Sequence, residues 1–319
     1  MMLETLLLNP IAFNLGPITV HWYGVILGLA ALAGLALVVR EGKRFGISPD
    51  FFMDLLLFGV PSAVIVARIY FVAFKWEDYK GDLLSVFYIW EGGIAIYGAL
   101  IGAFACGIIY SRYKGYSFLR IADICAPGLI IGQLIGRWGN FVNQEAYGGP
   151  VQESFLRNDL HLPSWIVNQM NVEGVFHHPT FLYESLWNVV GLAILLVLRR
   201  QKFLIAGELL GFYFMWYALG RFYIEGLRTD SLAFSGPSWL ASFMNGLWSP
   251  MKSLGFQAGY LNGLEGNVRI SQLISVALLL ITLIIIVVRR VTGSSNIKYL
   301  DPIVSTKASK IKDEPQGAA

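Results

Sequence analysis

The sequence predicts an all-α polytopic membrane protein, and three observations predict it: the composition, the apolar runs and the placement of positive charge. Of the 319 residues, 55% are hydrophobic and only 14% are charged, whereas a soluble globular domain carries about 25% charged residues. Mean hydropathy is +0.58. The apolar runs reach the roughly 20 residues that a helix needs to cross the hydrocarbon core. These observations exclude a soluble globular protein.

Seven spans are predicted in order along the chain. They cover residues 18–39, 51–74, 92–110, 118–141, 180–198, 205–224 and 270–288. The connections that alternate between them hold fifteen Lys and Arg residues on one side and six on the other, while Arg68, Arg137 and Arg221 fall in or at the ends of spans. Because cytoplasmic loops carry the excess of positive charge, the N-terminus is expected outside and the C-terminus in the cytoplasm.

The remaining segments complete a seven-span domain over residues 1–290. Residues 144–177 form an outer loop that is long enough for a small folded cap, and residues 226–269 are expected to lie in the outer interface. Residues 291–319 are polar and Lys-rich, which predicts a disordered cytoplasmic tail with some attraction to anionic membrane lipids.

Polar and ionisable residues gather at the predicted outer ends of six spans. They are His21 and Tyr23; Arg68; Gly92, Gly93 and Tyr97; Arg137, Asn140 and Asn143; His178, Tyr183, Glu184 and Asn188; and Tyr217, Arg221, Glu225 and Arg228. A charge at membrane depth costs roughly 2.5 to 3.5 kcal/mol, so such a cluster requires partners, water or a ligand. The inner halves of the spans are mostly apolar, which favours a site open to the outer leaflet over a continuous pathway.

The densest polar block runs from Gly136 to Gly149. Arg137 and Asn140 are three residues apart and share a helical face, with Glu145 close by in sequence. A guanidinium beside amides can clamp a phosphate, because it presents a rigid fork of donors. The alternative is an Arg that snorkels from a helix end.

The sixth span carries Tyr217, Arg221, Glu225 and Arg228 on one stripe. Two arginines at the outer ends of different spans indicate an anionic head group, although Glu225 is also explained by a structural ion pair. For Arg68, a third site cation and a pair with Glu184 are equally open.

Three aromatic or imidazole side chains of the fifth span admit simple interpretations. His178 is a candidate proton shuttle, and an interfacial hydrogen-bonding role is the alternative. Tyr183 and Trp187 are expected to belong to the aromatic belt at the membrane surface. No nucleotide-binding, serine-hydrolase or zinc-protease motif is present, and no metal, cofactor or nucleic acid is expected.

The sequence resembles the phosphatidylglycerol–prolipoprotein diacylglyceryl transferase family from about residue 18 to residue 290. The motifs that carry the resemblance are residues 21–24, Gly92-Gly93 with Tyr97-Gly98, the block 136–148, His178-Pro179 with Tyr183-Glu184, and Gly220-Arg221-Phe222 with Glu225 and Arg228. The resemblance implies transfer of a diacylglyceryl group from phosphatidylglycerol to the lipobox cysteine of preprolipoprotein signal peptides, with release of glycerol 1-phosphate. It also implies a place in the bacterial inner membrane.

The same resemblance implies roles for particular residues. Arg137 and Arg221 match essential arginines; Tyr23, Gly93, Asn140, Glu145, Gly148 and Tyr217 match positions that bind phosphatidylglycerol; and Glu225 joins the arginines in catalysis. Tyr97 stands where many members have a histidine proposed as the base, so Tyr97 is the expected catalytic group at that position. A lipid or small-anion transporter that uses the same arginines without chemistry is the rival function, and a structural assembly protein is a weaker one.

Overall fold

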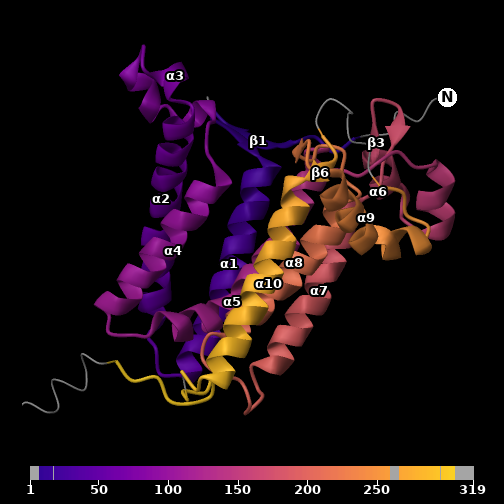
Figure 1. The fold of residues 1–319 in the computed structure, drawn as a ribbon. Coiled ribbons are helices and arrows are strands. Elements are labelled where there is room, and N and C mark those ends of the chain that lie inside the picture. Colours follow the sequence, from indigo (N-terminus) through magenta and orange to yellow (C-terminus); the bar gives the residue numbers. More distant parts are fainter. Residues whose placement is uncertain (1–6, 17, 259–265, 295, 306–319) are drawn as a thin grey trace, which may run out of the picture.

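A computed structural model describes residues 7–16, 18–258, 266–294 and 296–305 and shows a bundle of long helices with small strands at one end (Figure 1). We call the end that carries strand β1 (Ile11–Leu15) and helices α3 (Trp76–Tyr79) and α6 (Ser164–Gln169) the cap end. The opposite end, where α10 (Ile270–Val291) finishes at two arginines, is called the basic end.

Six helices in the described part of the chain are long and apolar enough to cross a membrane. They are α1 (Trp22–Arg44), α2 (Pro49–Phe74), α4 (Ile96–Tyr113), α5 (Phe118–Val142), α7 (Thr180–Leu198) and α10. The predicted polytopic membrane protein is thereby confirmed. The sixth predicted span corresponds to α8 (Glu208–Glu225), an 18-residue helix with three charged residues that packs against α5, α7 and α10.

Helix starts differ from the predicted spans at three places, each for a local reason. Residues 18–21 form strand β2 (Ile18–His21), which pairs with β1, because the β-branched Ile-Thr-Val run favours extended backbone. Gly92 and Gly93 adopt φ of +90° and +76°, so α4 begins only at Ile96. Gly207, with φ of +92°, likewise precedes α8.

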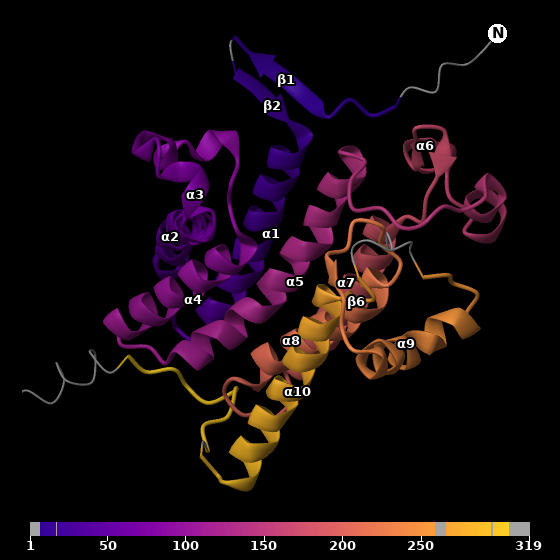
Figure 2. The same cartoon turned by 45° about the horizontal axis from the view of Figure 1, so that its top comes forward.

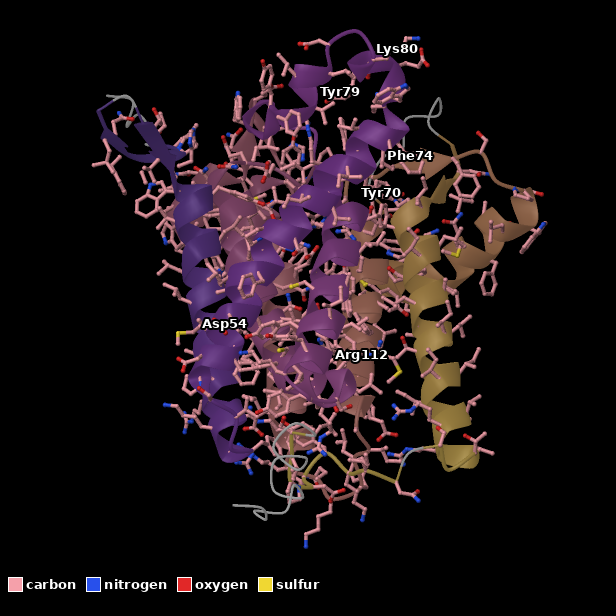
Figure 3. All side chains as sticks on the ribbon, turned by 90° about the vertical axis from the view of Figure 1, so that its left-hand side faces the viewer. Asp54, Tyr70, Phe74, Tyr79, Lys80 and Arg112 are labelled. Atoms are coloured by element: carbon pink, nitrogen blue, oxygen red, sulfur yellow. The ribbon has the colours of Figure 1, made fainter. Side chains whose placement is uncertain are left out.

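The long helices are arranged as three groups. Helices α2 and α4 pair with one another, α1 runs along α5, α7 and α8 pack on the other side of α5, and α10 packs against α8 (Figures 1 and 2). Tyr79 and Lys80 lie above α2 at the cap end, whereas Asp54 and Arg112 lie toward the basic end (Figure 3). The α2–α4 pair joins α1 and α5 through an apolar cluster that includes Val38, Phe52 and Ile124.

Helices α7 and α8 are held together by two tryptophans. The Trp187 and Trp216 rings stack with centroids 4.1 Å apart, and each indole N–H donates to the other residue's carbonyl oxygen, at 3.0 and 3.1 Å. Gly191 and Gly220 leave room for these indoles, because a Cβ on either would meet the opposing Nε1. Trp187 therefore lies between helices, and its assignment to the aromatic belt is wrong.

The cap end is built from two segments. Residues 144–177 contain a π-helical turn, η3 (Phe155–Asp159), then α6, β3 (Asn171–Val172) and β4 (Val175–Phe176), packed through Leu156 and Val167 on the cap ends of α5 and α7. Residues 226–269 contain β5 (Ala233–Phe234), α9 (Ser238–Ser253) and β6 (Val268–Arg269). Helix α9 lies on the side of the bundle away from α2 and α4 (Figure 2).

Residues 296–305 dock across the basic end, although composition assigns them to a disordered tail. The N–H of Tyr299 donates to Leu204 O at 2.9 Å, and the N–H of Ala206 donates to Ile297 O at 2.9 Å. The Tyr299 side chain is buried and its hydroxyl reaches Glu41 at 3.0 Å. The buried Tyr299 side chain thus anchors residues 296–305 to the bundle. The rest of the predicted tail, residues 306–319, lies outside the described residues.

Candidate active site

Arg137, Glu184 and Arg221 converge near the cap end from three different helices, and we call these three residues the arginine cluster. Arg137 Nε on α5 forms an ion pair with Glu184 Oε2 on α7, and Arg221 Nη1 on α8 lies 3.8 Å from Glu184 Oε1. The cluster lines a small cavity together with Gln133, Asn188 and Tyr217. Two guanidinium groups therefore face one carboxylate at the edge of a cavity.

Glu225 is the second carboxylate beside Arg221. Its Oε2 lies 2.8 Å from Arg221 Nη2 and 3.9 Å from Arg228 Nε, and the residue is 1% exposed. Arg228 in turn donates to Asp230 Oδ1 and Oδ2 at 2.9 and 2.6 Å. Burial alone would raise the pKa of Asp230, but the bonds from Arg228 outweigh burial and hold that pKa below its ordinary value. These contacts fix Arg221 in place from the side away from the cavity.

The signature block positions Arg137 through its own side chains. Asn140 Oδ1 accepts from Arg137 Nη1 at 3.2 Å, and Asn140 Nδ2 donates to Glu145 Oε1 at 2.8 Å. The backbone turns sharply after α5, with Gln144 and Ala146 at φ of +50° and +59°. Positive φ in non-glycine residues is strained, and its presence here indicates that the turn is held by surrounding contacts.

Gly148 joins the cap ends of α7 and α8 by backbone hydrogen bonds. Its N–H donates to His178 O at 3.0 Å, and the N–H of Gly149 donates to Leu227 O at 2.9 Å. A Cβ on Gly148 would lie 2.7 Å from His178 Cβ and 3.1 Å from Leu227 O. Glycine is required here by close backbone approach, which keeps the two helices that carry Glu184 and Arg221 in register.

Arg68 is held by backbone carbonyls of the segment between α3 and α4, which contains the 3-10 turns η1 (Leu83–Phe87) and η2 (Ile89–Glu91). Its guanidinium donates to the carbonyl oxygens of Ser85, Val86, Gly92 and Gly93 at 2.7 to 3.0 Å. The suggested pair with Glu184 is therefore wrong, and Gly93 acts as a carbonyl acceptor whose added Cβ would meet Arg68 Nη1 at 2.4 Å.

Two of the predicted tyrosines occupy different surroundings. The ring of Tyr23 on α1 packs against Gly139 of α5, where a Cβ would come within 2.7 Å of it. Tyr97 opens α4 and is 48% exposed. Within the described residues, no recorded contact links Tyr97 to the arginine cluster.

His178 is buried at the entrance of α7. Its Nδ1 lies 3.1 Å from Tyr183 Oη, and the rings of Phe155 and Phe256 pack around it. Burial, with a smaller contribution from neighbouring His177, lowers the pKa of His178 to about 4. A neutral imidazole at physiological pH is the consequence.

Comparison with known proteins decides the family. The family model described as prolipoprotein diacylglyceryl transferase matches residues 10–288. Proteins named phosphatidylglycerol–prolipoprotein diacylglyceryl transferase from Bacillus licheniformis, Geobacillus kaustophilus and Bacillus velezensis are 48%, 47% and 46% identical to this chain over 292 to 294 residues. The alignments cover 92% of this chain and 96 to 97% of those proteins. The chain belongs to the prolipoprotein diacylglyceryl transferase family.

In this family member, Arg137 and Arg221 were predicted from the sequence, whereas the residue that joins them was not. Glu184 was predicted as part of a motif of the fifth span and as a possible partner of Arg68. Its actual partners lie 47 and 37 residues away in sequence. The signal that was available is spacing: Gln133 and Arg137 on α5, and Glu184 and Asn188 on α7, are each four residues apart. Such pairs lie on one helical face and therefore line the same cavity.

A second, apolar cavity lies closer to the basic end of this transferase-family chain. It measures about 450 Å³ and is lined mainly by α1, α2, α4 and α5, including Gly34, Ala63, Phe104 and Leu129. Helix α5 contributes one face, between Phe118 and Gly132, to this cavity and Gln133 and Arg137 to the polar one. No group of three or more potential metal ligands occurs within the described part of the chain.

Proposed function

We propose that this chain transfers the diacylglyceryl group of phosphatidylglycerol to the lipobox cysteine thiol of preprolipoproteins, the first step of bacterial lipoprotein maturation. The observation that carries the proposal is the convergence of Arg137 and Arg221 on Glu184 at the edge of a cavity. A phosphodiester is an anion that can compete with Glu184 for both guanidinium groups, and Arg forks bind phosphate oxygens in pairs.

We also propose a seven-span arrangement with α8 as the seventh span. Helix α8 packs against α5, α7 and α10, and its charged side chains find partners inside the bundle, as in the pairs Arg221–Glu225 and Arg290–Glu208. The positive charge of the basic end supports a cytoplasmic location for that end. The cap end and the arginine cluster then face the outer leaflet of the inner membrane.

The reaction proposed at the cluster is a substitution at carbon. The thiol sulfur attacks the diacylglycerol carbon bonded to the phosphate oxygen, a C–S bond forms, and the C–O bond breaks with its electron pair leaving on glycerol 1-phosphate. Arg137 and Arg221 stabilise the charge that collects on the departing phosphate. Glu225 and Glu184 orient the two arginines before the lipid arrives.

The thiol proton must leave in the same reaction. A free thiol has a pKa near 8.5, so modest assistance is sufficient. Tyr97 at the start of α4 remains the proposed base. The buried, neutral His178 contacts Tyr183 rather than the cluster, which supports a positioning role over proton transfer. Asn140, Glu145, Tyr23 and Tyr217 are proposed to shape the head-group site around Arg137 and Arg221.

The apolar cavity supports a lipid as the donor substrate. Its volume of about 450 Å³ and its lining of small and aliphatic side chains suit acyl chains. Lipid chains that enter between the α2–α4 pair and α5 would place the phosphate toward the cap end, where the arginine cluster lies.

The test is transfer of a labelled diacylglyceryl group from phosphatidylglycerol to a synthetic lipobox peptide by the purified protein. A thioether product is expected with the Cys peptide and none with a matched Cys→Ser peptide. Binding of phosphatidylglycerol without any product from a folded sample would reject the transferase proposal and leave lipid transport as the function.

A further inference from the structure

One helical turn below the arginine cluster lies a layer of neutral polar residues. Helix α5 runs toward the cap end and α7 runs away from it, so Gln133 and Asn188 both lie one turn deeper than Arg137 and Glu184. Four residues of helix correspond to about 6 Å. Both residues line the same cavity as the arginine cluster.

The Asn188 amide faces the cavity. The residue is 6% exposed and lines the cavity beside Glu184, and no hydrogen bond to its amide is found within the described residues. A ligand that enters the cavity can therefore hydrogen-bond to this amide without displacing a partner from the chain.

Gln133 repeats the pattern on α5. Its Nε2 donates to Tyr213 Oη at 2.9 Å, while its Oε1 is buried and has no hydrogen-bond partner in the described part of the chain. Tyr213 offers a hydroxyl, which can donate or accept, so Gln133 can present either amide atom to the cavity.

Helices α5 and α7 hold this layer at a fixed spacing. Ser185 Oγ donates to Leu134 O at 3.1 Å, which links the two helices between the cluster and the deeper layer. The two amides are thus rigidly placed below the arginines rather than free to reach up to them.

We propose that Asn188 and Gln133 bind the ester carbonyl oxygens of the donor lipid, an inference that rests on the proposed function. With the phosphate at Arg137 and Arg221 and the acyl chains pointing into the bilayer, the glycerol esters fall below the phosphate by about one helical turn. Ester carbonyls accept hydrogen bonds and carry no charge, so neutral amide donors at that depth match them. The amides are positioning residues that set how deep the lipid sits.

The experiment compares diester phosphatidylglycerol with the dialkyl ether lipid of the same chain length and head group. The ether lacks both carbonyls but keeps the carbon that the thiol attacks, so both lipids can react. For the wild-type protein we expect kcat/KM to favour the ester by about three- to tenfold for each of the two amide–carbonyl hydrogen bonds. In Asn188→Leu, the ester rate should fall about three- to tenfold toward the ether rate, because Gln133 still binds the second carbonyl, while the ether rate stays unchanged.

Gln133→Met provides the same readout from α5 and covers the case in which Asn188→Leu does not fold. Asn168→Leu, an amide of α6 in the cap, is the matched control and should keep the full preference for the ester. Equal losses on both lipids, or an unchanged ester preference in both cavity variants, would overturn the proposal. A changed preference for glycerol over ethanolamine head groups in either cavity variant would also overturn the proposal. A wild-type protein that uses neither lipid would instead reject the transferase function itself.

Discussion

Two buried clusters of arginine and carboxylate lie at opposite ends of this bundle, and they differ in what completes them. At the basic end, Glu41 is 1% exposed and is contacted by Arg199 at 3.3 Å, by Arg44 at 2.7 Å and by Tyr299 Oη at 3.0 Å. Here the chain supplies its own last partner, the tyrosine of residues 296–305. The contacts leave a closed, structural cluster.

At the cap end, the same kinds of side chain surround a cavity. Arg137 and Arg221 share Glu184, and the neighbouring Asn188 amide has no partner among the described residues. The comparison teaches that buried ionic groups alone do not mark a site. An unsatisfied polar atom does not mark one either, because Arg199 Nε at the basic end is also buried without a hydrogen-bond partner among the described residues. The difference is the cavity that the arginine cluster lines.

The largest expected effect is loss of transfer in Arg137→Gln. Removing one donor that stabilises developing negative charge costs about 10²- to 10³-fold in kcat. Arg137→Lys should retain more activity, because it keeps the charge but loses the fork. Arg157→Gln, at an exposed arginine of the cap paired with Glu153, is the matched control and should be unaffected. Normal rates in Arg137→Gln would remove this residue from the active site.

The complementary change is Glu41→Gln at the basic end. Loss of one partner from a buried ion pair destabilises by about 3 kcal/mol, because Arg199 is left without its carboxylate. Thermal unfolding in detergent should shift downward, while kcat and KM of the molecules that remain folded stay near wild type. If Glu41→Gln instead raised KM for phosphatidylglycerol strongly and left the unfolding temperature unchanged, the structural role assigned to the basic end would be contradicted.

Gly148→Ala tests whether the cap end depends on the register of α7 and α8. The added methyl group must displace His178 or the Leu227 carbonyl, and a misplacement near 1 Å costs about 100-fold in rate. Gly28→Ala on α1, where a Cβ meets nothing within 4 Å, is the control. Equal activities of the two variants would exclude this positioning role.

The sequence predicted the membrane class and all six apolar spans to within about five residues at each end, because a bilayer imposes length and hydropathy on a helix. The first and third spans were each placed four residues early, since β2 is apolar as well and the positive φ of Gly92 and Gly93 delays the start of α4. Arg137 and Arg221 were identifiable because charge inside a span is costly. Glu184 as their shared partner, and the docking of Tyr299, depend on contacts across three helices and across 258 residues, which one-dimensional spacing does not contain.

A pH dependence is expected from His178 in stability, with no effect on transfer near neutral pH. Its pKa of about 4 in the folded chain lies below the ordinary value of 6.5, so its contribution is complete above pH 6.5 and is lost as pH falls toward 4. The slope in that window is at most about 1.4 kcal/mol per pH unit. In His178→Asn, the free energy of unfolding should depend less on pH between 6.5 and 4. Transfer between pH 6.5 and 8 should show no titration from His178, and a transfer step that disappears in His178→Asn would restore the proton shuttle.

Binding of phosphatidylglycerol, without acceptor peptide, tests the difference between the two ends most directly. Head-group-labelled lipid should bind the wild-type protein and Glu41→Gln alike, and should bind Arg221→Gln at least tenfold more weakly, because one of two charge-assisted contacts to the phosphate is gone. Equal binding by wild type and Arg221→Gln, with a loss in Glu41→Gln, would contradict the assignment of the lipid site to the cap end.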